Sequence, residues 1–575
     1  MLKILAGLKP YWLKIVLVLG LTMAGVYADL FIPRIMANII NAGVLSQDWS
    51  QVPGQGLRML GCALAAILCS LIAGFFASQV AMSYGRDLRG QVFDRVTDFS
   101  QAEYDGFGPA SLLTRTTNDI SQLQQVVVMG LRIMLRAPLM IIGGTTMAYS
   151  TSPELFRVVF FSVPMLVLVV VILARRALPL STAIQQRIDR VNRLMREKLT
   201  GIRVQRAFGT EAYEEQRFDG ANRDLSQTSI KMNRTMSYLF PTITLLMAGV
   251  QIFLVYSGAL QVAAGTLQVG DVMAIIQYVV QIMHSLTIFS MIFMMLPRAI
   301  ASGRRVLEVL NTPLTLRDAP QPQRPERRGT LEFRDVSFTY GGAQEPALRG
   351  ISFTAQPGET IAIIGGTGSG KTTLLNLIPR FYDVTQGAVL VGGADVREMD
   401  LKDLRDRIGY VPQKAMLFGG SIADNIRYGH REATDQELAQ AARVAQAQEF
   451  IDDREQGYDA RVSQLGANLS GGQKQRLSIA RAVVREPDLY LFDDSFSALD
   501  AQTDRDLRAA LKEVTQDAIV LIVAQKVSTI RDASRILVLD KGTCVGMGTH
   551  HQLLETCQVY QEVVASQHGT EEVAP

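Results

Sequence analysis

The chain has 575 residues, more than one ordinary domain contains, so its length alone predicts at least two folded units. Hydrophobic residues make up 48% of the sequence and charged residues only 19%, a balance that excludes a disordered chain and favours a membrane protein. The formal net charge of +3 indicates no concentrated basic face, and we therefore expect no nucleic-acid partner.

Six apolar stretches in the first half reach the roughly 20 residues that a bilayer-spanning helix needs. Each is too long for a core strand, and most lack acidic residues. The predicted spans cover approximately residues 12–33, 57–80, 127–150, 156–178, 238–262 and 271–296. The first span runs well past the length of a signal-peptide core, so we expect a retained helix.

The distribution of basic residues predicts the orientation of these spans. About thirteen Lys or Arg lie from Arg175, at the end of the fourth span, to Arg234, before the fifth, whereas the loop near Gly265 between the fifth and sixth spans has none. Because basic loops stay in the cytoplasm, we expect both termini on that side of a bacterial inner membrane. The polar stretches 81–126 and 179–237 are rich in helix formers, which predicts that membrane helices continue about 30 Å into the cytoplasm.

Composition changes after the last span. We assign residues 1–310 to a transmembrane domain and the proline-rich, charged residues 311–328 to a linker. From residue 329 to 566 the chain alternates short buried-strand runs with helical segments, which is typical of an α/β domain. Residues 567–575 are expected to form a flexible tail.

A glycine-rich loop lies between the strand pattern 360–364 and the helical run 374–378, which is the context that a phosphate-binding loop requires. Its residues are Gly365, Gly366, Thr367, Gly368, Ser369, Gly370, Lys371, Thr372 and Thr373. In such a loop the backbone amides turn onto phosphate oxygens, Lys371 reaches the outer phosphates and Thr372 is a ligand for Mg²⁺. Asp493, at the end of the apolar strand 489–493, is the expected second Mg²⁺ group.

The segment Leu469-Ser-Gly-Gly-Gln473 adds a second motif before a helix. With it, the sequence resembles the ATP-binding cassette (ABC) transporters, whose signature reads LSGGQ, over essentially its whole length. The resemblance implies a multidomain membrane protein with a six-helix transmembrane domain, long cytoplasmic helical extensions and an α/β P-loop nucleotide-binding domain. It looks like a half-transporter of the type IV, B-family multidrug exporters. Segments 111–119 and 208–218 are similar to those around the family's two coupling helices.

The resemblance also implies ATP and Mg²⁺ as cofactors and assigns roles to further residues. Tyr340 corresponds to the aromatic that stacks on adenine, Gln413 to the Q-loop residue near nucleotide and metal, and Asp500 to the D-loop. Ser470, Gly471, Gly472 and Gln473 form the signature, which in the family closes over ATP held by the opposite cassette. A partner chain is therefore expected.

Three positions depart from the family pattern. Asp494 stands where the family usually has the Glu that deprotonates the attacking water, and a side chain shorter by one methylene withdraws the carboxylate by about 1.5 Å. Gln525 replaces the histidine that contacts the γ-phosphate, and an amide carries no charge. Residues 462–466 read VSQLG in place of the family's VGERG.

Asp494 and Gln525, beside an intact phosphate loop and signature, resemble the degenerate-site subunit of heterodimeric ABC exporters. Lys371, Asp494 and Gln525 would then form a slow catalytic site, while the signature completes the competent site of a partner that carries Glu and His. The expected cargo is an amphipathic drug, lipid or peptide, with membrane lipid as the surroundings. Two alternatives stay open: a homodimeric exporter or lipid flippase that uses Asp494 as its base, and an ATP-gated regulatory subunit.

Five ionisable residues lie in or beside the apolar spans, where charged groups are costly. They are Asp29, Arg34, Arg132, Arg136 and His284. Each is a candidate for a translocation cavity, and for Arg132 and Arg136 placement at the membrane interface or pairing within the bundle is the alternative.

Overall fold

The computed structural model describes residues 2–45, 49–325 and 329–571. The chain divides into two compact units. We call the first, Met1–Thr97 with Ala110–Thr312, the membrane unit, and the second, Asp98–Pro109 with Pro313–Pro575, the cassette unit.

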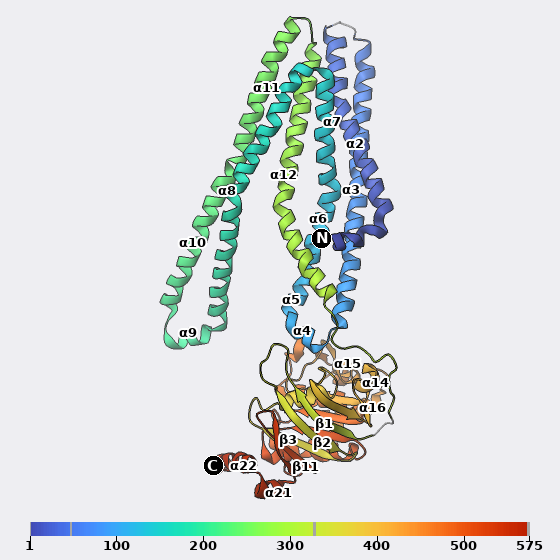
Figure 1. Cartoon of the computed structure of the whole chain (residues 1–575), viewed down its shortest axis with the longest axis vertical. Coiled ribbons are helices and arrows are strands. Elements are labelled where there is room, and N and C mark those ends of the chain that lie inside the picture. The colour runs from blue at the N-terminus through green and yellow to red at the C-terminus, as the bar shows by residue number, and fades with distance from the viewer. Residues whose placement is uncertain (1, 46–48, 326–328, 572–575) are drawn as a thin grey trace. The chain divides into compact units, whose positions relative to one another are not determined.

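Helices account for almost all of the described membrane unit (Figure 1). They are α1 (Leu2–Leu5), η1 (Ala6–Tyr11), α2 (Trp12–Ile39), η2 (Ile40–Leu45), α3 (Gln51–Thr97), α5 (Pro109–Thr114), η3 (Arg115–Asp119), α6 (Ile120–Met129), η4 (Gly130–Met134), α7 (Leu135–Thr151), α8 (Pro153–Thr200), α9 (Ile202–Phe208), α10 (Glu211–Ser237), α11 (Leu239–Ala263) and α12 (Val269–Asn311). Six helical stretches in the described residues are long and apolar enough to cross a membrane, which confirms the six predicted spans. The chain is a multi-pass membrane protein.

The long helices continue beyond their apolar segments, as the polar flanking stretches predict. α3 has 47 residues and α8 has 48, about twice the length that a bilayer requires. Ser152 caps α8, where its hydroxyl accepts a hydrogen bond from the Leu155 amide, and Gly209 ends α9 with a φ of 61°. α10 then packs back along α8, so that α8, α9 and α10 form a helical hairpin.

A buried carboxylate joins α12 to the π-helical turn η3. The Asp119 side chain, only 3% exposed, accepts hydrogen bonds from the Ser302 hydroxyl at 2.8 Å and from Arg305 Nε at 2.7 Å. Arg115 adds an ion pair of 2.6 Å to Glu308 on the next turn of α12. Because Asp119 cannot be hydrated at this depth, these donors replace its water shell.

Two main sheets build the cassette unit within the described residues. The antiparallel sheet has the order β2–β1–β4–β5, and the larger, mostly parallel sheet has the order β12–β11–β3–β10–β9–β6. The strands are β1 (Leu331–Phe338), β2 (Leu348–Ala355), β3 (Thr360–Gly365), β4 (Gln386–Val391), β5 (Ala394–Asp395), β6 (Ile408–Val411), β7 (Gly420–Ser421), β8 (Arg461–Val462), β9 (Leu489–Asp493), β10 (Ile519–Val523), β11 (Arg535–Asp540) and β12 (Thr543–Gly548).

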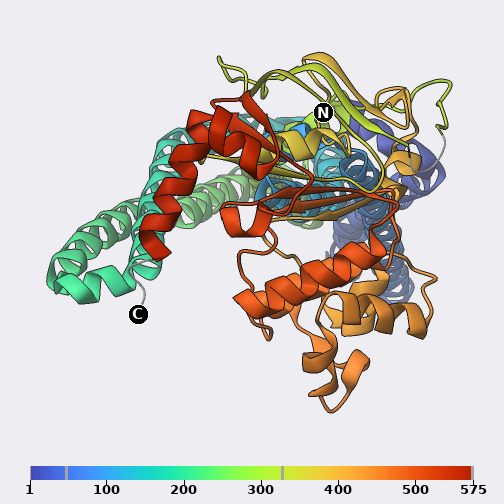
Figure 2. The same ribbon diagram turned by 90° about the horizontal axis from the view of Figure 1, so that it is seen from below.

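The apolar runs of the parallel strands bury both faces of the larger sheet. In β3, Ile361 and Ile363 join a core shared with the antiparallel sheet, whereas Ala362 and Ile364 join a core shared with helices. Figure 2 shows this layering, with yellow-green strands on one side of the orange-red sheet and orange helices on the other.

Helices surround these sheets in the described part of the cassette unit. They are α4 (Gln101–Phe107), α13 (Lys371–Leu377), α14 (Leu401–Asp406), α15 (Ile422–Arg427), α16 (Asp435–Val444), α17 (Gln448–Asp452), η5 (Gly457–Asp459), η6 (Gln464–Gly466), α18 (Gly471–Val483), α19 (Ala501–Val514), α20 (Val527–Ile530), α21 (His550–Thr556) and α22 (Gln558–Glu571).

Residues 567–571 are helical, although the sequence suggests a flexible tail from residue 567. α22 extends to Glu571, and Gln567 within it is tied to the strand–helix connection at residues 525–527. The side-chain nitrogen of Gln567 donates to the backbone carbonyl of Gln525 at 2.8 Å, and its side-chain oxygen accepts from the backbone amide of Val527 at 2.8 Å. Residues 572–575 of the predicted tail lie outside the described residues.

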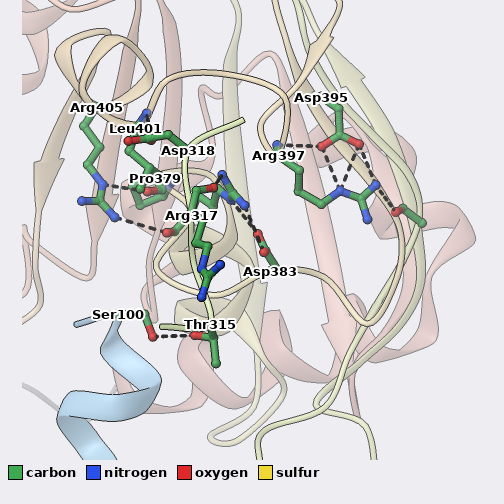
Figure 3. A network of polar contacts seen from close by, with 12 residues as sticks. Ser100, Thr315, Arg317, Asp318, Pro379, Asp383, Asp395, Arg397, Leu401 and Arg405 are labelled. Carbon is green, nitrogen blue, oxygen red and sulfur yellow. Dashed lines mark hydrogen bonds and ion pairs between the residues drawn. The ribbon is translucent and has the colours of Figure 1, made fainter. Parts of the chain in front are cut away.

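Residues 315–318 of the segment predicted as a linker are hydrogen-bonded to other parts of the cassette unit (Figure 3). The carbonyl of Arg317 accepts from Arg380 at 3.2 Å, and the Asp318 carboxylate accepts from the Leu401 amide at 3.0 Å. α4 joins the same network, since the Ser100 and Thr315 hydroxyls are 3.0 Å apart. Residues 326–328 of the predicted linker lie outside the described residues.

We predict that Asp119→Ala destabilises the protein by about 1–3 kcal/mol, because it leaves the buried Ser302 hydroxyl and the Arg305 guanidinium without their acceptor. The measurement is thermal unfolding of the detergent-solubilised chain, followed by the loss of its monodisperse size-exclusion peak. Asp94→Ala, which removes an exposed carboxylate from α3, is the matched control. Equal melting temperatures for the two variants would contradict the role of Asp119.

Candidate nucleotide site

Parallel register brings three strand ends to one edge of the larger sheet. Val523 of β10 is level with Ile363 of β3 on one side and with Asp493 of β9 on the other. The residues that follow these strands are therefore neighbours, and the backbone shows it: the Asp494 amide donates to the Val523 carbonyl at 3.0 Å. Carboxyl ends of parallel strands are where α/β sheets bind ligands.

The glycine-rich loop after β3 has the geometry of a phosphate cradle. Gly368 and Gly370 have φ values of 79° and 97°, which favour glycine. A Cβ at Gly370 would lie 2.8 Å from the Ala347 carbonyl oxygen, so a side chain does not fit there. The Ser369 hydroxyl is buried without a hydrogen-bond partner among the described residues. An orphaned polar group in this loop fits a bound phosphate oxygen.

Lys371 begins α13 and lies over this loop. Its ammonium donates to the carbonyls of Gly365 and Gly366, each at 2.8 Å. Burial lowers the pKa of Lys371, and the carboxylates of Asp494 and Asp493 oppose that shift. The amine is thus held, partly desolvated, against the glycine-rich loop, and its contact with a nucleotide's phosphates stays a prediction.

Thr372 and Asp493 face each other across the site. The Thr372 hydroxyl donates to Asp493 Oδ1 at 3.0 Å. Burial raises the pKa of Asp493, a hydrogen bond from Thr372 opposes this, and the Asp494 charge adds to it. A hydroxyl and a carboxylate are hard oxygen ligands of the kind Mg²⁺ takes, and the cation would offset the cost of burying the carboxylate. These two residues fit the Mg²⁺ that the sequence implies.

The Asp494 carboxylate is held by two amides that the sequence places far apart. Its Oδ2 accepts from Gln525 Nε2 at 2.8 Å and from Gln413 Nε2 at 3.3 Å. Asp494 is 8% exposed, with a φ of 48°, so backbone as well as side chain is fixed. The structure brings Asp494, Gln525 and Gln413 together, and it directs the Gln413 amide nitrogen to Asp494.

Tyr340 lies beside the loop, as expected for a base-stacking aromatic. Its hydroxyl is 3.0 Å from the Thr373 hydroxyl, and its ring packs edge-on against Tyr382 with centroids 5.3 Å apart. Tyr382, which sequence reasoning missed, donates to Asp105 of α4 at 2.8 Å. Burial raises the pKa of the Tyr382 phenol, and the hydrogen bond to Asp105 adds to the shift. Its only sequence signal is an aromatic pair shortly after the α13 helix.

The signature lies on a different part of the unit from the phosphate loop. Ser470 caps α18: its hydroxyl accepts from the Gln473 amide at 3.3 Å, and the Gln473 side chain accepts from the Ser470 amide at 3.0 Å. α18 packs against α15, α16 and β6, whereas α13 packs against β3 and β9. Ser470 and Gly471 are exposed, so the signature is open to a second molecule.

Asp500 has a structural role at the start of α19. Its carboxylate accepts from the Thr503 amide at 3.0 Å, and this hydrogen bond lowers the pKa of Asp500. A nucleotide contact of Asp500 stays a prediction. Within residues 462–466, where the sequence differs from the family pattern, Leu465 is 58% exposed and has a φ of 57°.

We predict that Lys371→Ala weakens ATP binding by at least about tenfold, because it removes a charged donor to phosphate. The measurement is equilibrium binding of a fluorescent ATP analogue to the chain in lipid nanodiscs. Lys402→Ala, an exposed lysine on α14, controls for loss of surface charge. Unchanged affinity in the Lys371 variant would contradict the assignment of this loop.

Both units match families of known proteins. Residues 15–286 match the ABC transporter transmembrane region, and residues 348–497 match the ABC transporter domain. An uncharacterised ABC transporter ATP-binding protein of Mycobacterium tuberculosis is 40% identical over 565 residues, 97% of each chain. A fatty acid ABC transporter ATP-binding/permease protein of Mycobacterium bovis is 35% identical over 523 residues, 89% of this chain and 82% of that protein.

The solved structure of a bacterial Atm1-family ABC exporter with ATP bound superposes with a TM-score of 0.80 at 26% identity, over 97% of this chain and 98% of that one. The six membrane-spanning helices agree with the match to a transmembrane region. The chain belongs to the ABC transporters and has the exporter fold, with an ATPase domain that couples ATP hydrolysis to transport.

Proposed function

We propose that the chain is one subunit of a heterodimeric ABC exporter that moves an amphipathic substrate outward by alternating access, and that its own ATP site binds nucleotide but turns it over slowly. The observation that carries this proposal is the pair of amides on Asp494 Oδ2, donated by Gln525 at 2.8 Å and by Gln413 at 3.3 Å. A carboxylate oxygen engaged by two donors accepts a proton from water only after an amide moves away.

The side chains available at this site support the same proposal. Asp494 is shorter than glutamate, which puts its carboxylate about 1.5 Å further from a water held at hydrogen-bond distance. Gln525 donates a hydrogen bond but carries no charge for the γ-phosphate. A general base and a positioning group are each worth on the order of 10²–10⁴ in rate, and they act together. The contact of Lys371 with the loop and the hydrogen bond between Thr372 and Asp493 support binding of nucleotide and Mg²⁺ at the same site.

The signature supports a second, competent site in the complex. Ser470 and Gln473 keep a complete capping box, and the first signature residues are exposed. In the proposed dimer they close over ATP held by a partner half-transporter that carries Glu and His at the positions of Asp494 and Gln525. Hydrolysis at that site resets the transporter, while ATP at this chain's site holds the two cassettes together.

The orientation belongs to the proposal as well. The basic stretch between α8 and α11 supports a cytoplasmic position for both termini and for the cassette unit. Residues 98–109 form part of the cassette unit, and the hydrogen bond from Tyr382 to Asp105 supports α4 as a coupling element. The fatty acid transporter among the relatives supports an amphipathic cargo.

One observation favours a second candidate, a homodimeric exporter that hydrolyses ATP with Asp494. The Oδ1 atom of Asp494 has no hydrogen-bond partner among the described residues. That oxygen is free to accept a proton if a water reaches it. An ATP-gated regulatory subunit is the remaining alternative, and uptake into vesicles by the reconstituted complex distinguishes it from an exporter.

We predict that the chain alone in nanodiscs hydrolyses ATP at the background rate of its Lys371→Ala variant. In the complex with a partner whose own catalytic glutamate is replaced by glutamine, the double substitution Asp494→Glu with Gln525→His should raise turnover at least tenfold, because it restores the reach of the base and a chargeable γ-phosphate contact. Asp494→Gln with Gln525→His is the matched control and should stay at background. Wild-type turnover of about 1 s⁻¹ or more would favour the homodimer instead.

For the complex with its partner, we predict that Asp494→Ala changes steady-state ATP turnover by less than about threefold, since hydrolysis proceeds at the other site. The equivalent substitution of the partner's glutamate should abolish turnover. The measurement is phosphate release from the reconstituted heterodimer at saturating ATP. A loss beyond tenfold in the Asp494 variant would overturn the slow-site assignment.

A further inference from the structure

The membrane unit contains a cavity of about 700 Å³, within the range of sites that bind small molecules. Its walls come from α2, α3, α12 and the helical run α6–η4–α7. Most of the lining is apolar, including Leu21, Val26, Ile133 and Met140. Four of the five ionisable candidates face it, Asp29, Arg132, Arg136 and His284, whereas Arg34 is not among the lining residues. The cavity therefore gathers most of the candidate charges that hydrocarbon would exclude.

These charges do not cancel. Arg136 and Asp29 form an ion pair of 2.7 Å, which uses one cation and the only carboxylate in the lining. Arg132 has no hydrogen bond or ion pair with any described residue. Its guanidinium packs against the backbone of Gly74, where an added Cβ would lie 3.6 Å from Arg132 Cζ. One guanidinium thus remains with its donors available to the cavity.

Further polar groups converge on the same space. Gln281 lines the cavity from α12, and its Oε1 is buried without a hydrogen-bond partner among the described residues. The side-chain oxygen of Gln281 therefore accepts no hydrogen bond from the described protein residues. His284 lies three residues further along α12, so it is on the same face. Arg132 belongs to η4, a π-helical turn, and such turns often mark functional sites.

We propose that this cavity binds an amphiphile with an anionic oxyanion head, a carboxylate or a phosphate, whose head pairs with Arg132 and whose chain lies on the apolar wall. A planar guanidinium with five donors matches such a head better than any other group in the lining. The Asp29–Arg136 ion pair has no net charge and hardly repels a cationic amphiphile. The positive charge of Arg132 does repel it. The inference rests on the proposed export function, for which it names the substrate class.

The test is nucleotide-free binding to the full chain in a non-ionic detergent, read by native mass spectrometry, which counts bound molecules. Laurate, dodecyl phosphate, dodecanol and dodecyltrimethylammonium are matched in chain length and differ in head group. We expect one saturable site for laurate or dodecyl phosphate and at least tenfold weaker binding of the other two. Inorganic phosphate at the same concentration should displace neither anion, because it lacks the chain.

Substitutions in opposite directions test the assigned residues. Arg132→Gln should weaken the binding of the anionic probe at least tenfold, and Arg132→Lys should retain most of it. Asp29→Asn should strengthen binding several-fold, because it frees Arg136. Arg176→Gln, an exposed arginine of α8 outside the cavity, should bind as the wild type does.

Equal binding of anionic and cationic probes, or of Arg132→Gln and wild type, would overturn the inference. Displacement by inorganic phosphate would show a phosphate site without an amphiphile and would overturn it as well. If Arg132→Gln does not fold, Asp29→Asn decides, since weaker or unchanged anion binding there contradicts the inference. No nucleotide is present, so these outcomes are independent of ATP turnover at Asp494.

Discussion

The register of three parallel strands is the constraint on which the chemistry of the cassette depends. β3, β10 and β9 run side by side with Ile363, Val523 and Asp493 at one level, so whatever follows each strand meets at one edge. The phosphate loop, Asp494 and the segment leading to Gln525 share that edge, with neighbouring strands about 4.8 Å apart and β10 between β3 and β9. Two of the departures from the family pattern, Asp494 and Gln525, are therefore joined by a hydrogen bond at Asp494 Oδ2. The effect of each residue depends on the other.

Local sequence signals predict what local physics determines. The six spans follow from apolar length, and the phosphate loop follows from glycines that a strand and a helix enclose, so both could be predicted without a structure. Contacts between distant residues could not. Gln413 and Gln525 meet Asp494 from 81 and 31 residues away, and no periodicity encodes that meeting. The same holds for Gln567, whose bonds to residues 525–527 make a helix of a segment that composition suggests is flexible.

In the membrane unit, too, the sequence identifies the charged residues but not their contacts. Sequence alone identifies Asp29, Arg132, Arg136 and His284 as costly in hydrocarbon, but it leaves pairing, interface and cavity as equal readings. The fold resolves them differently for neighbouring residues: Arg136 pairs with Asp29 across 107 residues, whereas Arg132, one turn earlier, is left without a described partner. Arg132 lies in the π-helical turn η4, so its backbone departs from regular α-helix geometry. A hydropathy pattern does not reveal where such a turn lies.

Binding and turnover of ATP depend on different atoms, which is why a site can retain one and lose the other. Loop amides, Lys371, Thr372 and Asp493 would contact groups that are already charged in bound ATP, so they would contribute to affinity before any reaction. A base and a γ-phosphate switch contribute chiefly in the transition state, where the water loses its proton. In the proposed heterodimer, two amides on Asp494 would raise the barrier to hydrolysis while the first set of residues kept the affinity. Nucleotide would then stay longer between the two cassettes, and the partner's site would set the lifetime of the closed dimer.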